Sequence, residues 1–262
     1  MDPRFLEAFA DAQNHARESY PKESCGFIVA DRYIRCENVA DPVEMHRADD
    51  RDCGCQLCAF EIAGPIYKKH AKRIQIVVHS HPDGPFYPSK ADMATQQAMG
   101  VAWAIIATDG ERVSDPLIWG GATPVPAILG RQFMHGVTDC YSLIRDVYRL
   151  GREELAKQDI DWPFDPIELP EFPRDDSWWV ENENLYMRNF AKAGFVQVDE
   201  PRPGDVFLLT VGRTDQLNHG GLLLNNNLIM HHLPERLSRR EPSGIWGRQI
   251  DVWLRYKGHA DA

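Results

Sequence analysis

The stretch VVHSHPDGPFYPSKAD, residues 77–92, decides the fold of the first half of the chain. An apolar run of β-branched residues ends in His79 and His81, and a loop with three prolines separates them from Ser89 and Asp92. Because residues two apart in a strand share a face, both imidazoles are predicted to point the same way at a strand end. Two imidazoles and one carboxylate suffice to hold a catalytic zinc ion and leave a position for water.

Each of these positions alone has a simpler interpretation. Ser89 and Asp92 fit an ordinary helix-capping pattern, and a histidine at a strand end is usually only a polar terminus. The four polar positions together favour a metal site, provided that the proline-rich loop folds back and brings Asp92 to the histidines.

The first half of the chain alternates short helical and strand patterns around this stretch. A polar, cysteine-rich loop is expected at 41–58, and the apolar run before His79 is typical of a buried strand. The other predicted elements are helices at 3–19, 60–73 and 89–100 and strands at 25–30, 33–39, 103–108 and 112–119.

The segment GGATPVPAILG, residues 120–130, has no periodicity and two prolines, which indicates a junction between domains. Beyond it we expect helices at 138–150 and around 184–193, then strands in DVFLLTV, HGGLLL, NLIMHH and IDVWLRY. The basic run RLSRREP, residues 236–242, reads as a solvated loop. The fold class is therefore α+β, in two small domains.

A second stretch, GVTDCYSLIRDVYR at 136–149, places Cys140 in the first turn of an amphipathic helix. Its buried stripe is predicted to comprise Leu143, Ile144, Val147 and Tyr148. The helix dipole there favours a thiolate, as a nucleophile requires, although a lone cysteine is often only a small buried side chain.

The segment NHGGLLLNNNLIMHH supplies histidines that could accompany this cysteine. It predicts a hairpin turning at residues 225–227, which sets His219 directly opposite His231 or His232, depending on the turn. In either register one imidazole faces another, so that one can act as a base and the other can orient it.

Composition excludes several classes of function. The 262-residue chain has a formal net charge of −10, which argues against binding nucleic acid through its phosphates. No apolar run approaches the roughly 20 residues of a bilayer-spanning helix. The charged N-terminal stretch does not read as a signal peptide, so we expect folding in a cytoplasm with reduced thiols.

The pattern DCGCQLC at 52–58 contains Cys53, Cys55 and Cys58. Reduced thiols in a polar loop are the simplest interpretation. The alternative is a second metal or iron–sulfur centre, with Cys36 or a partner chain as the fourth ligand, since no fourth ligand lies at a standard spacing.

The spacing His-Ser-His, seven residues, serine, two residues, aspartate resembles the JAMM metalloprotease motif, and PKESCGFIV supplies an upstream glutamate in the setting found in that family. The resemblance implies a cytidine-deaminase-like α/β/α fold with zinc held by His79, His81 and Asp92. It also implies that Glu23 takes a proton from the zinc-bound water and that Ser89 hydrogen-bonds the oxyanion.

A helix beginning with cysteine, then a strand with histidine, then a strand with a polar residue resembles the NlpC-type cysteine peptidases, a papain-like arrangement. PRPGDVFLL before His219 matches the family's usual lead-in. The resemblance implies Cys140 as nucleophile, His219 as base and His231 as the orienting residue. Such enzymes cut peptidoglycan stem peptides; the long segment between Cys140 and His219 departs from the family pattern.

The two domains in this order, assigned here to residues 1–122 and 127–262, resemble the lambda-type phage tail assembly family. YPKESCG, HSHPD, DDSWW, ENLY and the run at 130–146 carry the resemblance. It implies a virion tail tip protein that assembles with other tail tip or hub proteins in the host cytoplasm and cuts peptidoglycan in the cell wall at genome delivery.

Two other functions fit part of these observations. A structural assembly factor could keep peptidase folds that are catalytically silent in the particle. A cytoplasmic deubiquitinase-like or sulfur-carrier-processing enzyme fits the first half of the chain alone, and fold analogy is a weak guide to substrate.

Overall fold

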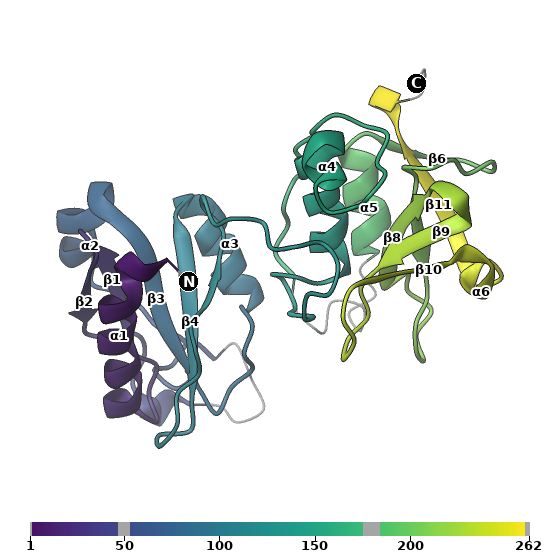
Figure 1. Ribbon diagram of the computed structural model, residues 1–262. Helices are drawn as coiled ribbons and strands as arrows, with labels where there is room; N and C mark the ends of the chain where they lie inside the picture. Colours follow the sequence, from purple (N-terminus) through teal and green to yellow (C-terminus); the bar gives the residue numbers. More distant parts are fainter. Residues whose placement is uncertain (1, 47–52, 175–183, 260–262) are drawn as a thin grey trace. The chain divides into compact units, whose positions relative to one another are not determined.

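The computed structural model describes residues 2–46, 53–174 and 184–259; the DDSWW segment lies outside the described residues (Figure 1). The fold is α+β. The chain divides into two compact units, Met1–Thr123 and Pro124–Ala262, each with its own sheet.

The first unit is built on a mixed sheet in the order β2-β1-β3-β4-β5. β3 and β4 run parallel, while the other neighbours are antiparallel. The strands are β1 (Cys25–Val29), β2 (Arg32–Cys36), β3 (Ile74–Pro82), β4 (Ala102–Thr108) and β5 (Leu117–Trp119).

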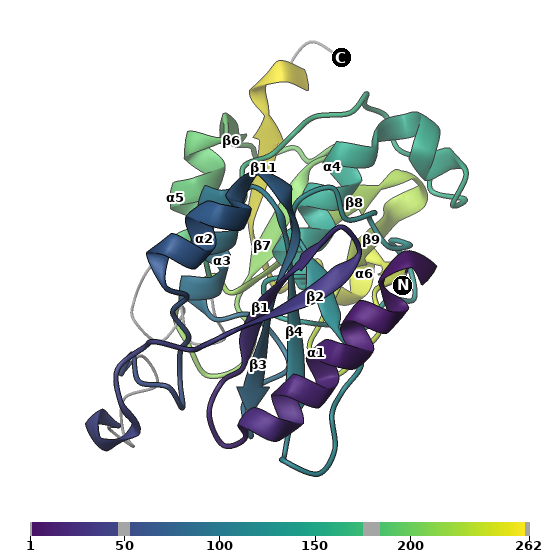
Figure 2. The ribbon, with the colours of Figure 1, turned by 90° about the vertical axis from the view of Figure 1, so that its left-hand side faces the viewer.

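Helix α1 (Leu6–Ser19) covers one face of this sheet, as Figure 2 shows. Its buried residues Ala8, Phe9, Ala12 and Ala16 share one side of the helix, and the three alanines let the backbone lie close to the strands. Pro65 lies in the first turn of α2 (Gly64–His70), where a missing N–H costs nothing. Helix α3 (Lys90–Met99) follows β3.

The second unit holds an antiparallel sheet in the order β10-β9-β8-β7-β11-β6. Its strands are β6 (Phe195–Gln197), β7 (Val206–Leu209), β8 (His219–Leu224), β9 (Leu228–His231), β10 (Arg239–Pro242) and β11 (Ile250–Tyr256). The helices are α4 (Cys140–Ala156), α5 (Leu185–Lys192) and α6 (Ser243–Trp246).

Helix α4 packs against β8 through the predicted apolar stripe. Leu143, Ile144, Val147 and Tyr148 are all fully buried, so this prediction is confirmed. Gly220 permits the close approach of α4 to β8, because a Cβ there would lie 3.3 Å from Cδ1 of Ile144. The helix therefore holds its first turn close to the start of β8.

Two sequence predictions need correction. The strand expected at 112–119 is reduced to β5, because the Asp109 side chain accepts from the backbone N–H groups of Glu111 and Arg112 and holds a turn there. The basic run at 236–242 is not a solvated loop throughout: its second half is β10, which pairs with β9. The short elements β6 and α6 were not predicted.

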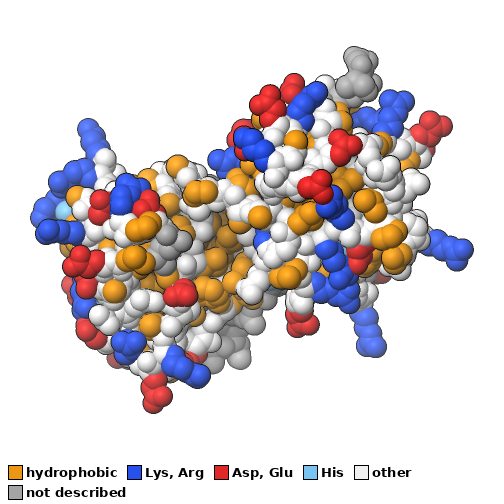
Figure 3. Space-filling view, in the orientation of Figure 1, with side chains coloured by type: hydrophobic (Ala, Val, Ile, Leu, Met, Phe, Trp, Pro, Cys, Tyr) orange, Lys and Arg blue, Asp and Glu red, His pale blue; other side chains and the backbone are white. Residues whose placement is uncertain are grey.

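Acidic and basic side chains are interspersed on the face drawn in Figure 3. Among the described residues, none of the helices has both the length and the apolar character needed to cross a bilayer.

Candidate functional site

The end of β3 and the start of α3 bring His79, His81 and Asp92 together. The two histidine Nε2 atoms are 3.0 Å apart, and they lie 3.4 and 3.5 Å from the Oδ1 and Oδ2 atoms of Asp92. Ligands about 2.0–2.1 Å from one tetrahedral ion would be separated by about 3.3–3.4 Å. The three side chains therefore fit a single zinc ion.

The second ring nitrogen of His81 supports this fit. His81 Nδ1 lies 2.8 Å from the Pro85 carbonyl oxygen, which only accepts, so Nδ1 carries the proton and Nε2 keeps its lone pair. Burial lowers the pKa of His79, and its ring stacks on Phe60 with centroids 4.7 Å apart. The site is thus enclosed by apolar side chains on the His79 side.

Asp92 caps α3 and also faces the two histidines. Its backbone N–H donates to Ser89 Oγ (3.0 Å) and its Oδ2 accepts from the Ser89 backbone N–H (2.8 Å), which is a complete capping box. Ser89 Oγ also donates to Asp92 Oδ2 at 2.7 Å. The cap holds the carboxylate toward the histidines, and the Ser89 hydroxyl hydrogen points at that carboxylate.

Glu23 lies just before β1 and is buried. Burial raises its pKa to about 8, with His81 and Asp92 as its charged neighbours. A hydrogen bond fixes its backbone, because the Glu23 N–H donates to the Gln56 carbonyl oxygen at 2.8 Å. The predicted base is therefore placed close to His81 and Asp92, two of the three candidate metal ligands.

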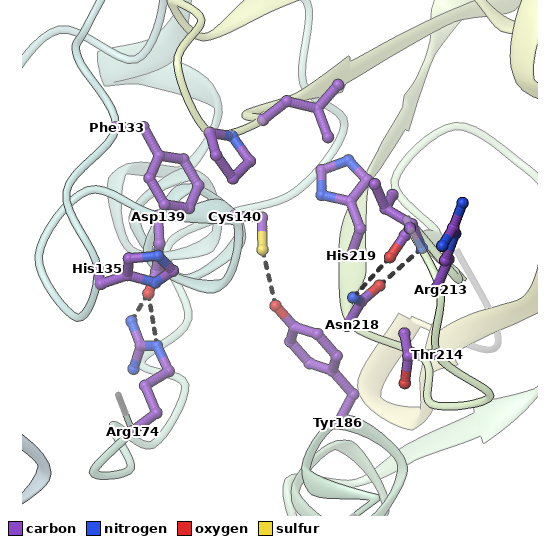
Figure 4. A pocket seen from close by; sticks show the side chains of 14 residues that line it. Phe133, His135, Asp139, Cys140, Arg174, Tyr186, Arg213, Thr214, Asn218 and His219 are labelled. Atoms are coloured by element: carbon purple, nitrogen blue, oxygen red, sulfur yellow. Dashed lines mark hydrogen bonds and ion pairs between the residues drawn. The ribbon is translucent and has the colours of Figure 1, made fainter. Parts of the chain in front are cut away.

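A cavity of about 270 Å³ in the second unit is lined by Cys140, Tyr186 and His219 (Figure 4). These side chains come from α4, α5 and β8, and the remaining lining includes Asp139 and Arg174. The structure therefore brings the predicted cysteine and histidine to one cavity.

Cys140 is the first residue of α4, but its sulfur is not in a thiolate-favouring environment overall. Burial raises its pKa to about 11, and the Asp139 carboxylate beside it acts in the same direction. Hydrogen bonds from the Tyr186 hydroxyl, 2.8 Å from Sγ, and from the Gly220 backbone lower the pKa. Desolvation outweighs the helix end, contrary to the expectation from sequence.

His219 begins a chain of hydrogen bonds. Its Nε2 lies 3.0 Å from His231 Nδ1, and His231 Nε2 lies 3.1 Å from Glu241 Oε2. The Trp246 indole N–H donates to the same Oε2 at 2.7 Å, and Arg239 lies 2.5 Å from the other carboxylate oxygen. These two contacts fix the Glu241 carboxylate, which is the last group in this series of hydrogen bonds.

The direction of the protons in this chain follows from Glu241. A carboxylate only accepts, so the Nε2 atom of His231 carries its proton and Nδ1 accepts from His219 Nε2–H. The lone pair of His219 then lies on Nδ1, the nitrogen that is not engaged by His231. Burial lowers the pKa of His219 to about 3, so the ring is neutral.

The register predicted for this hairpin was wrong. His231 pairs with Gly221, so His219 lies diagonal to it, two residues along the same face of the sheet. The turn spans Asn225–Asn227 and is centred on Asn226, with φ of +59°, one residue later than expected. The two rings still meet, and His232 instead has its Nε2 3.1 Å from the Arg236 carbonyl oxygen.

A buried ion pair lies beside Cys140. Arg174 donates through Nε and Nη2 to both oxygens of Asp139, at 2.7 and 2.8 Å, and also to Ser142 Oγ. Asp139 is the N-cap of α4 and accepts from the Ser142 backbone N–H. Burial raises the pKa of Asp139, but the Arg174 guanidinium outweighs it and holds that pKa below its usual range.

Three residues of this site were not predicted from the sequence. Tyr186 lies in the ENLY segment, but nothing in its spacing connects it to Cys140. Glu241 belongs to the run read as a loop, and Arg174 lies in an irregular segment. Each reaches the site from an element distant in the chain, which sequence spacing cannot indicate.

The cysteines of the first unit are arranged differently from the expectation. Cys36 ends β2, with its Sγ directed to the Ile34 carbonyl oxygen, and it is not grouped with the other three. The side chain that joins Cys53, Cys55 and Cys58 is His46. The sequence prediction of Cys36 as fourth ligand is therefore wrong.

Comparison with known proteins gives two family matches. Residues 6–118 match the model of prokaryotic homologs of the JAB domain, and residues 114–254 match the NlpC/P60 family. Tail tip assembly protein K of Escherichia phage lambda is 35% identical over 184 residues, which cover 70% of this chain and 78% of that protein. The protein of the same name from Escherichia phage N15 is 31% identical over 254 residues, covering 93% of this chain and 91% of that protein.

Proposed function

Because this chain belongs to the family of two-domain phage tail proteins that includes tail tip assembly protein K, we propose that it is a tail tip assembly protein that also cleaves peptidoglycan stem peptides. The observation that carries the peptidase proposal is the shared cavity of Cys140 and His219, with His231 and Glu241 behind the histidine. Its partners are other tail tip or hub proteins and, at genome delivery, the bacterial cell wall.

In the proposed reaction the Cys140 sulfur attacks the carbonyl carbon of a stem-peptide amide while His219 Nδ1 takes the thiol proton. The C–N bond then breaks as the imidazolium returns this proton to the leaving amine, and water hydrolyses the thioester with His219 again as base. His231 and Glu241 hold the ring and stabilise its positive charge.

The resting pair in this mechanism is a neutral thiol and a neutral imidazole. The pKa of Cys140 is raised to about 11 and that of His219 is lowered to about 3, both chiefly by burial. An ion pair would have to be formed within a desolvated cavity. Proton transfer is therefore expected to accompany the attack on the substrate rather than precede it.

In the first unit, His79, His81 and Asp92 would hold a zinc ion, which supplies Lewis-acid activation of water. Glu23 is proposed to receive the proton released there, because its buried carboxyl group lies beside His81 and Asp92. Ser89 would donate its hydroxyl hydrogen to an oxyanion by turning away from Asp92. The substrate of this site is proposed to be an amide or isopeptide bond.

Digestion of purified peptidoglycan by the full chain tests the second unit. We expect the wild type to release cleaved stem peptides, resolved by mass spectrometry, and Cys140→Ala to lower the rate by at least about 10³-fold. Cys36→Ala is the matched control, because Cys36 is a buried cysteine of the other unit, and its rate should equal that of the wild type. Equal cleavage by Cys140→Ala would refute the assignment.

The burial of Cys140 and His219 favours one second candidate function, a structural tail component with a silent peptidase fold. Complementation of a phage that lacks this chain separates the two functions. If Glu23→Ala combined with Cys140→Ala restores both tail assembly and infection, the chain acts as a scaffold alone. Restored assembly without infection supports the peptidase.

A further inference from the structure

The loop between β2 and α2 gathers four soft metal-binding side chains, His46, Cys53, Cys55 and Cys58. A tight turn makes this possible: the backbone N–H groups of Cys58 and Ala59 both donate to the Cys55 carbonyl oxygen at 2.9 Å. The turn brings the sulfur of Cys58 back to those of the other two cysteines. Cys53 and Cys55 are buried.

The donor atoms form a small, nearly regular group. Cys53 Sγ lies 3.3 Å from Cys55 Sγ and 3.5 Å from Cys58 Sγ. His46 Nδ1 lies 3.5, 3.4 and 3.5 Å from the sulfurs of Cys53, Cys55 and Cys58, respectively. All four atoms lie within 4.8 Å of one another.

Hydrogen bonding among the four side chains does not account for this geometry. A neutral imidazole has one nitrogen lone pair, which accepts one hydrogen bond, yet three sulfurs surround Nδ1 of His46 at nearly equal distances. A thiol is also a weak donor. Nearly equal distances from one imidazole nitrogen to three sulfurs are what a common central ion produces.

The spacing also identifies the kind of ion. With zinc–sulfur bonds of about 2.3 Å and zinc–nitrogen bonds of about 2.0–2.1 Å, a tetrahedron has edges of about 3.8 Å between sulfurs and about 3.6 Å between sulfur and nitrogen. The observed edges are within about 0.5 Å of these values. An iron–sulfur cluster would hold its ligands farther apart, because several irons lie between them.

We propose that His46, Cys53, Cys55 and Cys58 bind one structural Zn²⁺ ion, separate from the site at His79, His81 and Asp92. Three cysteines and one histidine are an ordinary closed shell for structural zinc, with no position left for water. His46 supplies the fourth ligand that the C-x-C-x-x-C pattern lacks.

This zinc ion would fix a loop that supports the first candidate site. The Gln56 carbonyl, between two of the cysteines, accepts from the Glu23 backbone N–H at 2.8 Å. Two residues after Cys58, the Phe60 ring stacks on the ring of His79. The structural ion therefore positions the backbone of the proposed base and the apolar wall beside one metal-binding histidine.

Cobalt substitution of the full chain tests this proposal. A thiolate bound to Co²⁺ gives an intense near-ultraviolet charge-transfer absorption, which a site of two histidines and an aspartate cannot give. We expect this absorption in the wild type, its strong reduction in Cys55→Ser and its retention in Asp92→Asn. Cys36→Ser is the matched cysteine control and should match the wild type.

Zinc analysis after dialysis completes the test. Cys55→Ser should lose one zinc equivalent per chain relative to Cys36→Ser. A wild-type cobalt protein without thiolate absorption would overturn the proposal, and so would iron with the absorption of a cluster. Because the readout is the thiolate signal, the result does not depend on whether the site at His79 binds metal or whether either unit is active.

Discussion

Replacing Tyr186 with phenylalanine is expected to raise the pKa of Cys140 and to slow the reaction of its sulfur with an alkylating reagent. The Tyr186 hydroxyl lies 2.8 Å from Sγ, and this hydrogen bond lowers the pKa of the thiol against the effect of burial. The substitution removes one oxygen and keeps the ring, so the packing of α5 against α4 should persist.

The size of the expected pKa change follows from the negative charge of the Cys140 thiolate, which accepts the hydrogen bond from Tyr186. A hydrogen bond to a charged group contributes about 1.5–3 kcal/mol, and one pKa unit corresponds to about 1.4 kcal/mol. The pKa of Cys140 should therefore rise by about one to two units. At neutral pH, where the sulfur is mostly protonated, the thiolate fraction and the alkylation rate should fall about 10- to 100-fold.

The assay is alkylation by iodoacetamide as a function of pH, with Cys140 followed by peptide mass spectrometry because the chain has six cysteines. Tyr148→Phe is the matched control. Tyr148 lies on the same helix as Cys140, and this substitution removes a buried hydroxyl that donates to the Gly204 carbonyl oxygen at 2.9 Å. An unchanged or downward-shifted Cys140 profile in Tyr186→Phe would refute the reasoning.

The remaining predictions concern the histidine chain, the buried ion pair and the first metal site. His231→Ala should lower kcat for stem-peptide cleavage about 10²- to 10⁴-fold. The control His232→Ala removes a neighbouring buried ring that is not hydrogen-bonded to His219, and it should change kcat less than about threefold. Equal losses in the two variants would contradict the role of His231. Arg174→Met leaves the Asp139 carboxylate buried and unpaired, so urea unfolding should show a loss of about 3–5 kcal/mol. Because the pKa of Asp139 is depressed in the folded state, its contribution to stability is complete above its ordinary pKa near 4. This contribution decreases below that pH and is lost as the pH falls through the lower folded-state pKa; a variant loss that does not shrink in acid would argue against this. Asp92→Asn should remove one zinc equivalent by metal analysis while circular dichroism shows the helices intact, and full zinc retention would exclude Asp92 as a ligand.

Local spacing predicted the two parts of the first candidate site, and the fold brings these parts together. His79 and His81 are two apart in a strand, and Asp92 follows Ser89 by three residues in a capping box, so both arrangements are decided within a few residues of chain. The apolar stripe of α4 was predictable for the same reason, because helical periodicity alone selects its buried side. Burial of the sulfur was not predictable, and it reversed the expected direction of the Cys140 pKa.

The sequence by itself determined most of the helices and strands and selected His79, His81, Asp92, Cys140 and His219 as candidate site residues. Only the tertiary structure decided that His231 rather than His232 meets His219, because a one-residue change in the turn shifts the whole register of β8 and β9. Tyr186 and Glu241 likewise reach the second site through packing between distant elements. Such contacts depend on how helices and strands that are distant in sequence pack against one another, and local sequence patterns do not specify that packing.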